Sequence, residues 1–445
     1  MNPILLWLLM HAAIAATEGP AAALRTEVEI FQLPQSLALK LIPRLLEPGT
    51  AAAAYAELES ACDRRQAERT GTLLTRSVPG VPSVSRQVET VRYGMEYEMP
   101  DYRTEPEIEP GKPLAVANGA ATYQERPVGS MLETQPAIDG TLQLSSDHST
   151  LEGWDRIEAS LRWDGHKYYV AQPVFRTRRI QSEIANTHGA PCVLGIFSMP
   201  ERQGFWELHI ATPSVRRRLA QPAKGKDTAL SRQVRIELQR IRLAQDEALP
   251  LRARLLDPAQ ASAAHEALLR MVQEGSAELV EWSTLLTIEP QRAVSENVKE
   301  QRYATELEQP HPPQTLPPLT AEMESSLVYS ELRDGGTPFN LPTTFDTRDT
   351  GETLGVEPSV SLDGNVIGMI INASNVRHQG FTRWGSGPDY EGNSTFVFQL
   401  DFKTLRTSTN LSLTNGHWML LQFSRLQESK DQCDLTLLRT TTEHP

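Results

Sequence analysis

The sequence predicts an α+β fold made of two tandem modules, each with a mostly antiparallel β-sheet, one principal helix and a long Pro-rich loop. Three observations predict it. Apolar residues alternate with a period of two through much of the chain, which is typical of strands with one buried face. The 31 prolines among the 445 residues crowd into a few stretches, which disfavours a helical bundle. Short motifs recur in the same order about half a chain apart, which indicates an internal duplication.

The recurring motifs set the predicted boundaries. Their spacing grows from about 210 to about 227 residues along the chain, as expected of a duplication followed by loop insertions. We place the modules at 25–213 and 232–425, with a basic linker at 214–231 and a polar tail at 426–445. The pairs include Arg44-Leu45-Leu46-Glu47-Pro48 with Arg254-Leu255-Leu256-Asp257-Pro258, Leu73-Leu74-Thr75 with Leu285-Leu286-Thr287, Gly153-Trp154 with Gly380-Phe381, and Phe175-Arg176-Thr177 with Phe402-Lys403-Thr404.

Each module begins with an alternating strand, around Val28 in the first and Val234 in the second. The strand is predicted to lead into the Arg-Leu-Leu-acid-Pro motif, which the proline closes because the residue before proline avoids helical angles. One principal helix follows, at 51–68 and 261–274, where Ala, Leu and Glu are abundant and Gly275 is placed to end the second helix. Next come a strand and a Pro-rich surface loop, at 100–113 and 310–342.

Two hairpins are predicted in the later module. Alternating apolar residues lead to Asp363-Gly364, an apolar strand returns beyond it, and the Asp-Gly pair supplies the positive φ angles of a tight turn. Residues 409–413 and 417–422 are predicted to pair across Asn415-Gly416 in the same way. The earlier module has weaker counterparts, including Asp139-Gly140.

The first sixteen residues are predicted to be a signal peptide, because an apolar run leads into small residues up to Ala16; a buried N-terminal helix is the alternative. No later stretch holds 18 consecutive apolar residues, so no transmembrane helix is expected. The formal charge of −13 argues against nucleic acid as a partner. Cys62, Cys192 and Cys433 lie too far apart in the sequence for a metal-ligand spacing.

A Thr-Gly pair, an alternating Leu-Val-Pro strand, an Asp-Gly turn and a closing Asn-Gly turn follow one another in the later module. The residues are Thr350, Gly351, Leu354, Val356, Pro358, Asp363, Gly364, Asn415 and Gly416. Their order resembles that of the secretin family, the outer-membrane channel subunits of type II and type III secretion systems and type IV pili. Only about twenty residues separate Leu238 from Ala261, where secretins carry a long segment with membrane and gate hairpins, so the resemblance implies a shortened or accessory member.

The resemblance implies a non-catalytic protein of the periplasm or outer membrane that acts as a structural or accessory component of a secretion or pilus apparatus. Secretin subunits pack the edges of their sheets together, so the implied partners are further copies of the chain or other secretion and pilus components, with outer-membrane contact also open. The edges of the hairpins at Asp363-Gly364 and Asn415-Gly416 are the expected pairing sites.

An enzyme is not expected. The sequence has no His-Glu-x-x-His, Gly-x-Ser-x-Gly or P-loop motif, so we assign no catalytic residue, no metal and no cofactor. The alternative function is a soluble periplasmic binding module for an envelope glycan or peptide. In that case Trp154 and Phe381, each preceded by glycine, would stack on the ligand; core packing or an interface contact is the other interpretation of these aromatic residues.

Overall fold

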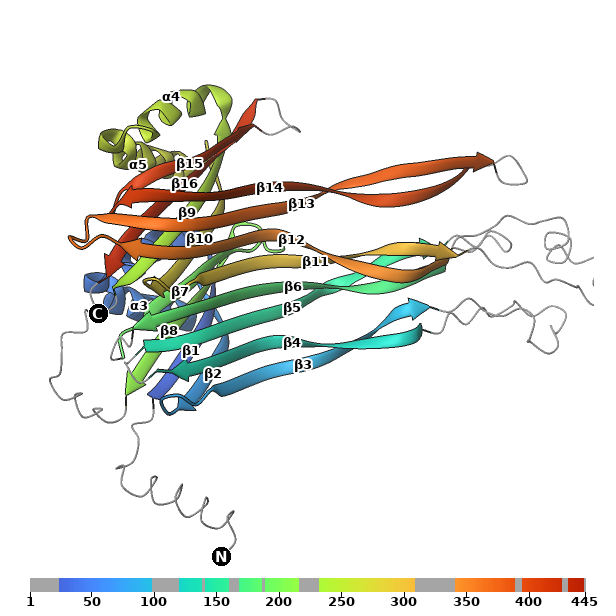
Figure 1. Cartoon of the computed structure of the whole chain (residues 1–445), viewed down its shortest axis with the longest axis horizontal. Helices are drawn as coiled ribbons and strands as arrows, with labels where there is room; N and C mark the ends of the chain where they lie inside the picture. Colours follow the sequence, from blue (N-terminus) through green and yellow to red (C-terminus); the bar gives the residue numbers. More distant parts are fainter. Residues whose placement is uncertain are drawn as a thin grey trace, which may run out of the picture.

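Figure 1 shows the computed structural model of the chain, which describes residues 24–97, 120–137, 141–159, 168–185, 189–215, 232–308, 341–388, 394–425 and 431–443. These residues hold sixteen strands and four helices, and their strand pairs are antiparallel, which confirms the mostly antiparallel α+β class. The predicted signal peptide at 1–16 lies outside the described residues, as do the loop at 100–113 and nearly all of the linker and of the loop at 310–342.

The first half of the chain contains β1 (Leu24–Pro34), α2 (Gln35–Leu45), α3 (Pro48–Asp63), β2 (Glu68–Ser77), β3 (Ser83–Tyr97), β4 (Ala120–Pro136), β5 (Thr141–Ala159), β6 (Tyr168–Ala185), β7 (Cys192–Ser198) and β8 (Phe205–Val215). The second half contains β9 (Gln233–Ala244), α4 (Gln245–Leu255), α5 (Pro258–Glu274), β10 (Glu278–Ile288), β11 (Ala293–Glu308), β12 (Leu341–Val360), β13 (Val366–Pro388), β14 (Ser394–Thr414), β15 (Trp418–Arg425) and β16 (Gln432–Glu443).

Both halves have the same order of elements: one strand, two helices and seven strands. Even the irregularities recur. The β7–β8 ladder shifts register after Val193 and the β15–β16 ladder after Leu420, and these two residues are separated by the same number of positions as Phe175 and Phe402 of the recurring motifs. A duplication would leave this recurrence. The register of the ladders also corrects one of the sequence matches. Leu73 lies opposite Val28 and Ser283 lies opposite Leu238, so Leu73 corresponds to Ser283, two residues before Leu285.

The strands form two layers (Figure 1). One layer holds the four-stranded sheets β2-β1-β8-β7 and β10-β9-β16-β15, with β7 next to β10. The other is a long eight-stranded sheet of β3 to β6 and β11 to β14, in which β6 pairs with β11 and β11 with β12. At one further pair, Thr344 of β12 lies opposite Glu96 of β3, so the long sheet curls at that end.

Two hydrophobic cores follow from this layering. The first lies between the helices and the four-stranded sheets, where Leu41 and Leu58 of the first half and Leu255 and Leu268 of the second are buried. The second lies between the four-stranded sheets and the long sheet. The layer of four-stranded sheets is therefore covered on both faces, by the helices on one and by the long sheet on the other. Because apolar burial stabilises by about 25 cal/mol per Å², this layer carries much of the stability of the fold.

Each half has two helices where the sequence predicted one principal helix. The Arg-Leu-Leu-acid-Pro motif ends α2 and α4, and its proline begins the next helix. Proline suits the first helical position because its missing N–H would have no partner there. Gly275, at φ 79°, ends α5 as predicted. Among the described residues no helix is long and apolar enough to cross a membrane.

Two further predictions are wrong. The polar tail at 426–445 contains β16, which pairs with β9 and buries Cys433, Leu435 and Leu437. The strands on either side of Asn415-Gly416 do not form a hairpin, since β14 belongs to the long sheet and β15 pairs with β16 in the other layer. The turn is tight, as expected, but it carries the chain from one layer to the other.

Candidate functional site

The two halves join through the edges of their sheets. In the long sheet, residues 175–181 of β6 run antiparallel to residues 294–300 of β11, with Thr177 opposite Val298. Arg179 and Glu296 also face each other there, and 3.4 Å separates the guanidinium nitrogen from the carboxylate oxygen. Backbone pairing with opposite charges across the strands stabilises neighbouring strands.

The second layer continues the joint, because β7 lies next to β10. Trp206 of β8 and Trp282 of β10 meet edge to face, with ring centroids 6.3 Å apart. Asn297 of β11 donates a hydrogen bond to the carbonyl oxygen of Ser198 at 3.0 Å. The joint between the halves, defined here as β6 and β7 against β11 and β10, is therefore built in both layers.

One pair in the joint carries like charges. Arg176 lies opposite Lys299. Glu152 accepts a hydrogen bond from Arg176 and lies 3.8 Å from the Lys299 ammonium, and a Glu201 oxygen lies 3.1 Å from the Arg176 guanidinium. Two carboxylates thus neutralise two cations that would otherwise repel each other across the strands.

A buried polar cluster links the layers inside the first half. Glu207 of β8 is fully buried and accepts hydrogen bonds from His148 of β5 at 2.9 Å and from His209 at 3.1 Å. Arg178 of β6, also fully buried, lies 3.3 Å from the same carboxylate. Ser146 lies 3.0 Å from the other ring nitrogen of His209. With His209 neutral, its Nε2 donates to Glu207 and its Nδ1 accepts from the serine hydroxyl.

The protonation states follow from this geometry. Burial alone would raise the pKa of Glu207, but Arg178 and the two imidazole hydrogen bonds hold it well below its usual range. Burial lowers the pKa of His209. The ligand atoms of His148, Glu207 and His209 lie within 4.8 Å of one another, a set that a transition metal could use. However, the Arg178 cation shares the carboxylate, so we assign the cluster to the packing of the layers.

The second half has a different polar pair at the corresponding place. Asp434 of β16 corresponds to Glu207, and it is paired with Arg242 at 2.9 Å and with Arg377 at 3.8 Å. Both halves thus use a buried carboxylate and arginine between their layers, and only the first half adds histidines.

Glu352 of β12 lies in a second buried cluster. Arg240 is 2.5 Å from Glu352 and 2.7 Å from Glu281. Burial, together with repulsion from Glu281, raises the pKa of Glu352 to about 8, against the opposing pull of Arg240. One arginine is therefore shared by two carboxylates, and burial together with the nearby Glu281 favours the protonated form of Glu352.

The residues of the secretin-like motif take up structural positions. Thr350 donates from its hydroxyl to the carbonyl of Lys299 at 3.1 Å, and Leu354 and Val356 are buried in the core under the long sheet. Pro358 lies opposite Met369. The motif therefore fixes β12 against β11 and against the core.

The structure brings the two turn motifs together. Asp363 accepts hydrogen bonds from the Ser361 hydroxyl at 2.6 Å and from the Asn365 amide at 3.1 Å, which shapes the turn that ends at Gly364. Asn415 donates to the Gly364 carbonyl at 3.0 Å and accepts from the Thr442 amide at 3.1 Å. Gly416 has φ 80°. The pairing edges predicted at Asp363-Gly364 are wrong, because β12 and β13 each have a neighbour on both sides. At Asn415-Gly416 the edge of β14 is open, because its described pairing is with β13 only.

The glycine–aromatic pairs also recur in place. Gly153, with φ 157°, and Gly380, with φ 130°, each follow a register shift in their ladders. The Trp154 side chain is 47% exposed, whereas the Phe381 side chain lies outside the described residues. A β-bulge re-aims the next side chain, so Trp154 is available for contact on the outer surface.

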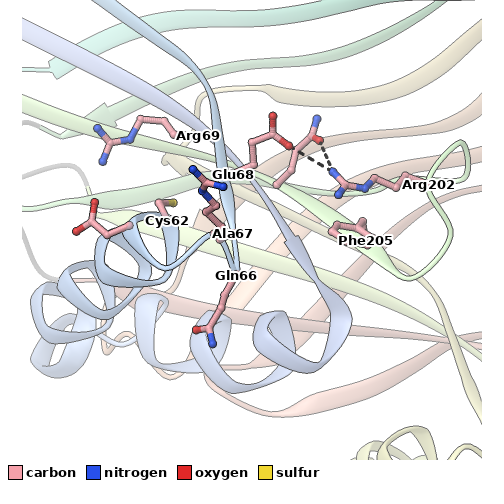
Figure 2. A pocket seen from close by; sticks show the side chains of 10 residues that line it. Cys62, Gln66, Ala67, Glu68, Arg69, Arg202 and Phe205 are labelled. Carbon is pink, nitrogen blue, oxygen red and sulfur yellow. Dashed lines mark hydrogen bonds and ion pairs between the residues drawn. The ribbon is translucent and has the colours of Figure 1, made fainter.

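A shallow pocket lies between the end of α3 and β2 (Figure 2). Arg202 crosses it, donating to Gln32 at 3.3 Å and lying 3.5 Å from Glu68. Cys62 lines the pocket, but burial raises the pKa of its thiol, which disfavours the reactive thiolate. Arg202 is thus paired with neighbouring side chains, and the pocket is open to solvent.

Sequence reasoning missed the joint and the buried clusters. Glu207 and His209 are two residues apart in an alternating strand, which places both side chains on one face, so their closeness could have been predicted. The approach of His148 and Arg178 depends on how β5 and β6 stack over β8, for which the sequence carries no local signal.

No family model matches the sequence, and no curated protein matches it. Solved secretin structures are similar. The InvG secretin of the Salmonella SPI-1 type III secretion injectisome is 10% identical, with a TM-score of 0.22 over 67% of this chain and 87% of that chain. The type IV competence pilus secretin PilQ of V. cholerae is 12% identical, with a TM-score of 0.21 over 56% and 70%. The type II secretin GspD of enteropathogenic Escherichia coli is 10% identical, with a TM-score of 0.18 over 56% and 79%. The likeness is to a secretin-like fold and concerns the fold alone.

Proposed function

We propose that this chain is a non-catalytic structural subunit that assembles through its sheets, as a component of a secretin-type secretion or pilus apparatus in the bacterial envelope. One observation carries the proposal: both halves merge into one long sheet that ends in open strands. Along β14 the described pairing is with β13 only, and β3 pairs with β4 and otherwise only at Glu96. An open strand edge is a template for pairing with another chain.

The use of polar groups supports a structural role. The clusters around Glu207 and Glu352 are buried between the layers, where their carboxylates pair with Arg178 and Arg240. Such groups hold the layers in a defined arrangement.

The envelope location and the secretion or pilus partners rest on the motif at Thr350-Gly351 and the turns that follow it, together with the apolar N-terminal run. These features favour an exported chain whose partners are further copies of itself or other apparatus components, in the periplasm or at the outer membrane.

The test is the assembly state of the full chain extracted with mild detergent and studied by mass photometry and negative-stain electron microscopy. We expect particles of many copies with a regular outline. A monomer at every concentration, with native lipid present, would remove the proposal.

The exposure of Trp154 keeps a second function in view, a binding module for an envelope glycan or peptide. An exposed aromatic ring next to a bulge can stack on a sugar or an apolar side chain. Trp154→Ala should then abolish binding to isolated peptidoglycan or lipopolysaccharide while thermal unfolding stays unchanged. Equal retention of both polymers by the variant and the parent would argue against it.

A further inference from the structure

Corresponding strands of the two halves differ in how much of them is covered. The register of the ladders places β3 in correspondence with β11, and β6 with β14. Asn297 of β11 is 5% exposed in the joint, whereas its counterpart Gln87 is exposed. Val88, the counterpart of Val298, is 38% exposed.

The opposite edge shows the same difference. Phe175 and Ile180 of β6, which lie opposite Glu300 and Ser295 of β11, are fully buried, but their counterparts Phe402 and Thr407 of β14 are only half-buried. Each half is therefore covered on the side that faces the other half and uncovered on the side that faces outward.

The other layer agrees. Val193 and Ile196 of β7 are buried beside β10, while their counterparts in β15, Leu420 and Phe423, are half-buried. Leu74 of β2 is 39% exposed, and its counterpart Thr284 in β10 is fully buried. In both layers, the strands at the outer edges thus lack the neighbouring strand that their counterparts have in the joint.

We propose that the outer edges meet on a second copy of this chain in the register of the internal joint: β14 of one copy pairs with β3 of the next, and β15 lies beside β2. The occupant is a second copy because the chain itself displays the complementary pair of edges, already joined once. This inference rests on the proposed function and adds the strands and the register.

The register makes the charges specific. In place of Thr177 and Val298 at the centre, Thr404 would lie opposite Val88. In place of Arg176 and Lys299, Lys403 would lie opposite Glu89, which replaces a like-charge pair by an attractive one. Arg406 and Arg86 would stand where Arg179 and Glu296 form an ion pair, so this position is weaker than its internal counterpart.

The joint is heterologous, because it uses two different edges of the chain, and such a contact repeats until it closes as a ring or extends as a filament. Since each copy contributes both halves, a closed ring would contain an even number of halves. Images that resolve the halves should show this even number.

The test uses cysteine pairs under mild oxidation. All chains carry Cys62→Ser, because Cys62 is the one native cysteine among the described residues that is not buried. Chains with Val88→Cys are mixed with chains with Thr404→Cys, and the internal pair Val298→Cys with Thr177→Cys in one chain is the matched control for the same geometry. We expect a covalent dimer from the mixture, none from either variant alone, and an internal disulfide without change of mass in the control.

The outcomes separate the two proposals. Large particles without the mixed dimer, while the control pair does form its disulfide, would overturn the register and leave the assembly role standing. The absence of both particles and dimer would overturn both. A second measurement does not depend on cysteines: Glu89→Lys should lower the mass of the particles, and adding Lys403→Glu to the same chain should restore it.

Discussion

Gly351 packs against Asn297 so closely that a Cβ atom on the glycine would lie 2.2 Å from the asparagine carbonyl oxygen. Gly129 stands in the same relation to Gln87, also at 2.2 Å, and both glycines have positive φ, 125° and 129°. The glycine of the predicted Thr-Gly motif is therefore a steric requirement of the contact between β12 and β11.

Gly351→Ala should destabilise the fold by about 2 kcal/mol or more, because both the backbone angle and the carbonyl contact oppose a side chain. The measurement is the midpoint of chemical denaturation. Gly355→Ala is the matched control in the same strand, since the nearest atom to its Cβ would lie at 3.8 Å. Equal effects of the two substitutions would contradict this account.

Removing the buried carboxylate of Glu207 should destabilise the fold far more than removing the partly exposed carboxylate of Glu201. Glu207→Gln leaves the fully buried Arg178 without its buried counter-charge, and breaking one partner of such a pair costs about 3–5 kcal/mol. Glu201→Gln, at a side chain that is 26% exposed, should cost about 1 kcal/mol or less. Denaturation of both variants at neutral pH checks the order, and a reversed order would show that Glu201 is the principal partner.

The features that could be predicted are those with a local signal. Alternating apolar residues identified β12 and β13 with the turn at Asp363-Gly364, and the abundance of Ala, Leu and Glu identified α5 up to Gly275. These elements depend on periodicity and on turn chemistry, both of which are read within a few residues.

The features that could not be predicted depend on distant partners. The strand after Asn415-Gly416 could pair with β14 or pass to the other layer. It passes to the other layer because β15 pairs with β16 there. The sequence did not predict β16, in which Leu435 and Leu437 are buried, because its polar residues at the end of the chain indicated a tail. The cluster at Glu207 similarly needs the stacking of the two layers.

Stability should fall as the pH rises from weakly acidic to weakly basic at the Glu352 cluster. The folded-state pKa of about 8 lies above the ordinary value of 4.5, so the folded chain binds a proton that the unfolded chain releases. The contribution of Glu352 to stability is then highest when the pH is below its pKa in the unfolded chain, and it declines until the pH passes its pKa in the folded chain.

Glu352→Gln should remove this part of the decline, because the amide keeps the shape of the protonated carboxyl without titrating. The test compares denaturation midpoints of the variant and the parent chain at pH 5 and at pH 8.5. We expect the two proteins to differ little at the lower pH and the variant to be the more stable at the higher pH. A parallel decline in both would assign the pH dependence to other groups.

Arg86→Glu should strengthen assembly. The substitution would place a carboxylate opposite Arg406 of the next copy, which recreates the arrangement of Arg179 and Glu296 in the joint between the halves. A favourable cross-strand charge pair contributes about 0.2–1 kcal/mol, so the concentration at which half the chains are assembled should fall by up to about fivefold. Arg92→Glu makes the same change of charge on β3 beyond the span that would pair. If it lowers the assembly concentration as much as Arg86→Glu does, net charge rather than the register of β3 against β14 governs the association.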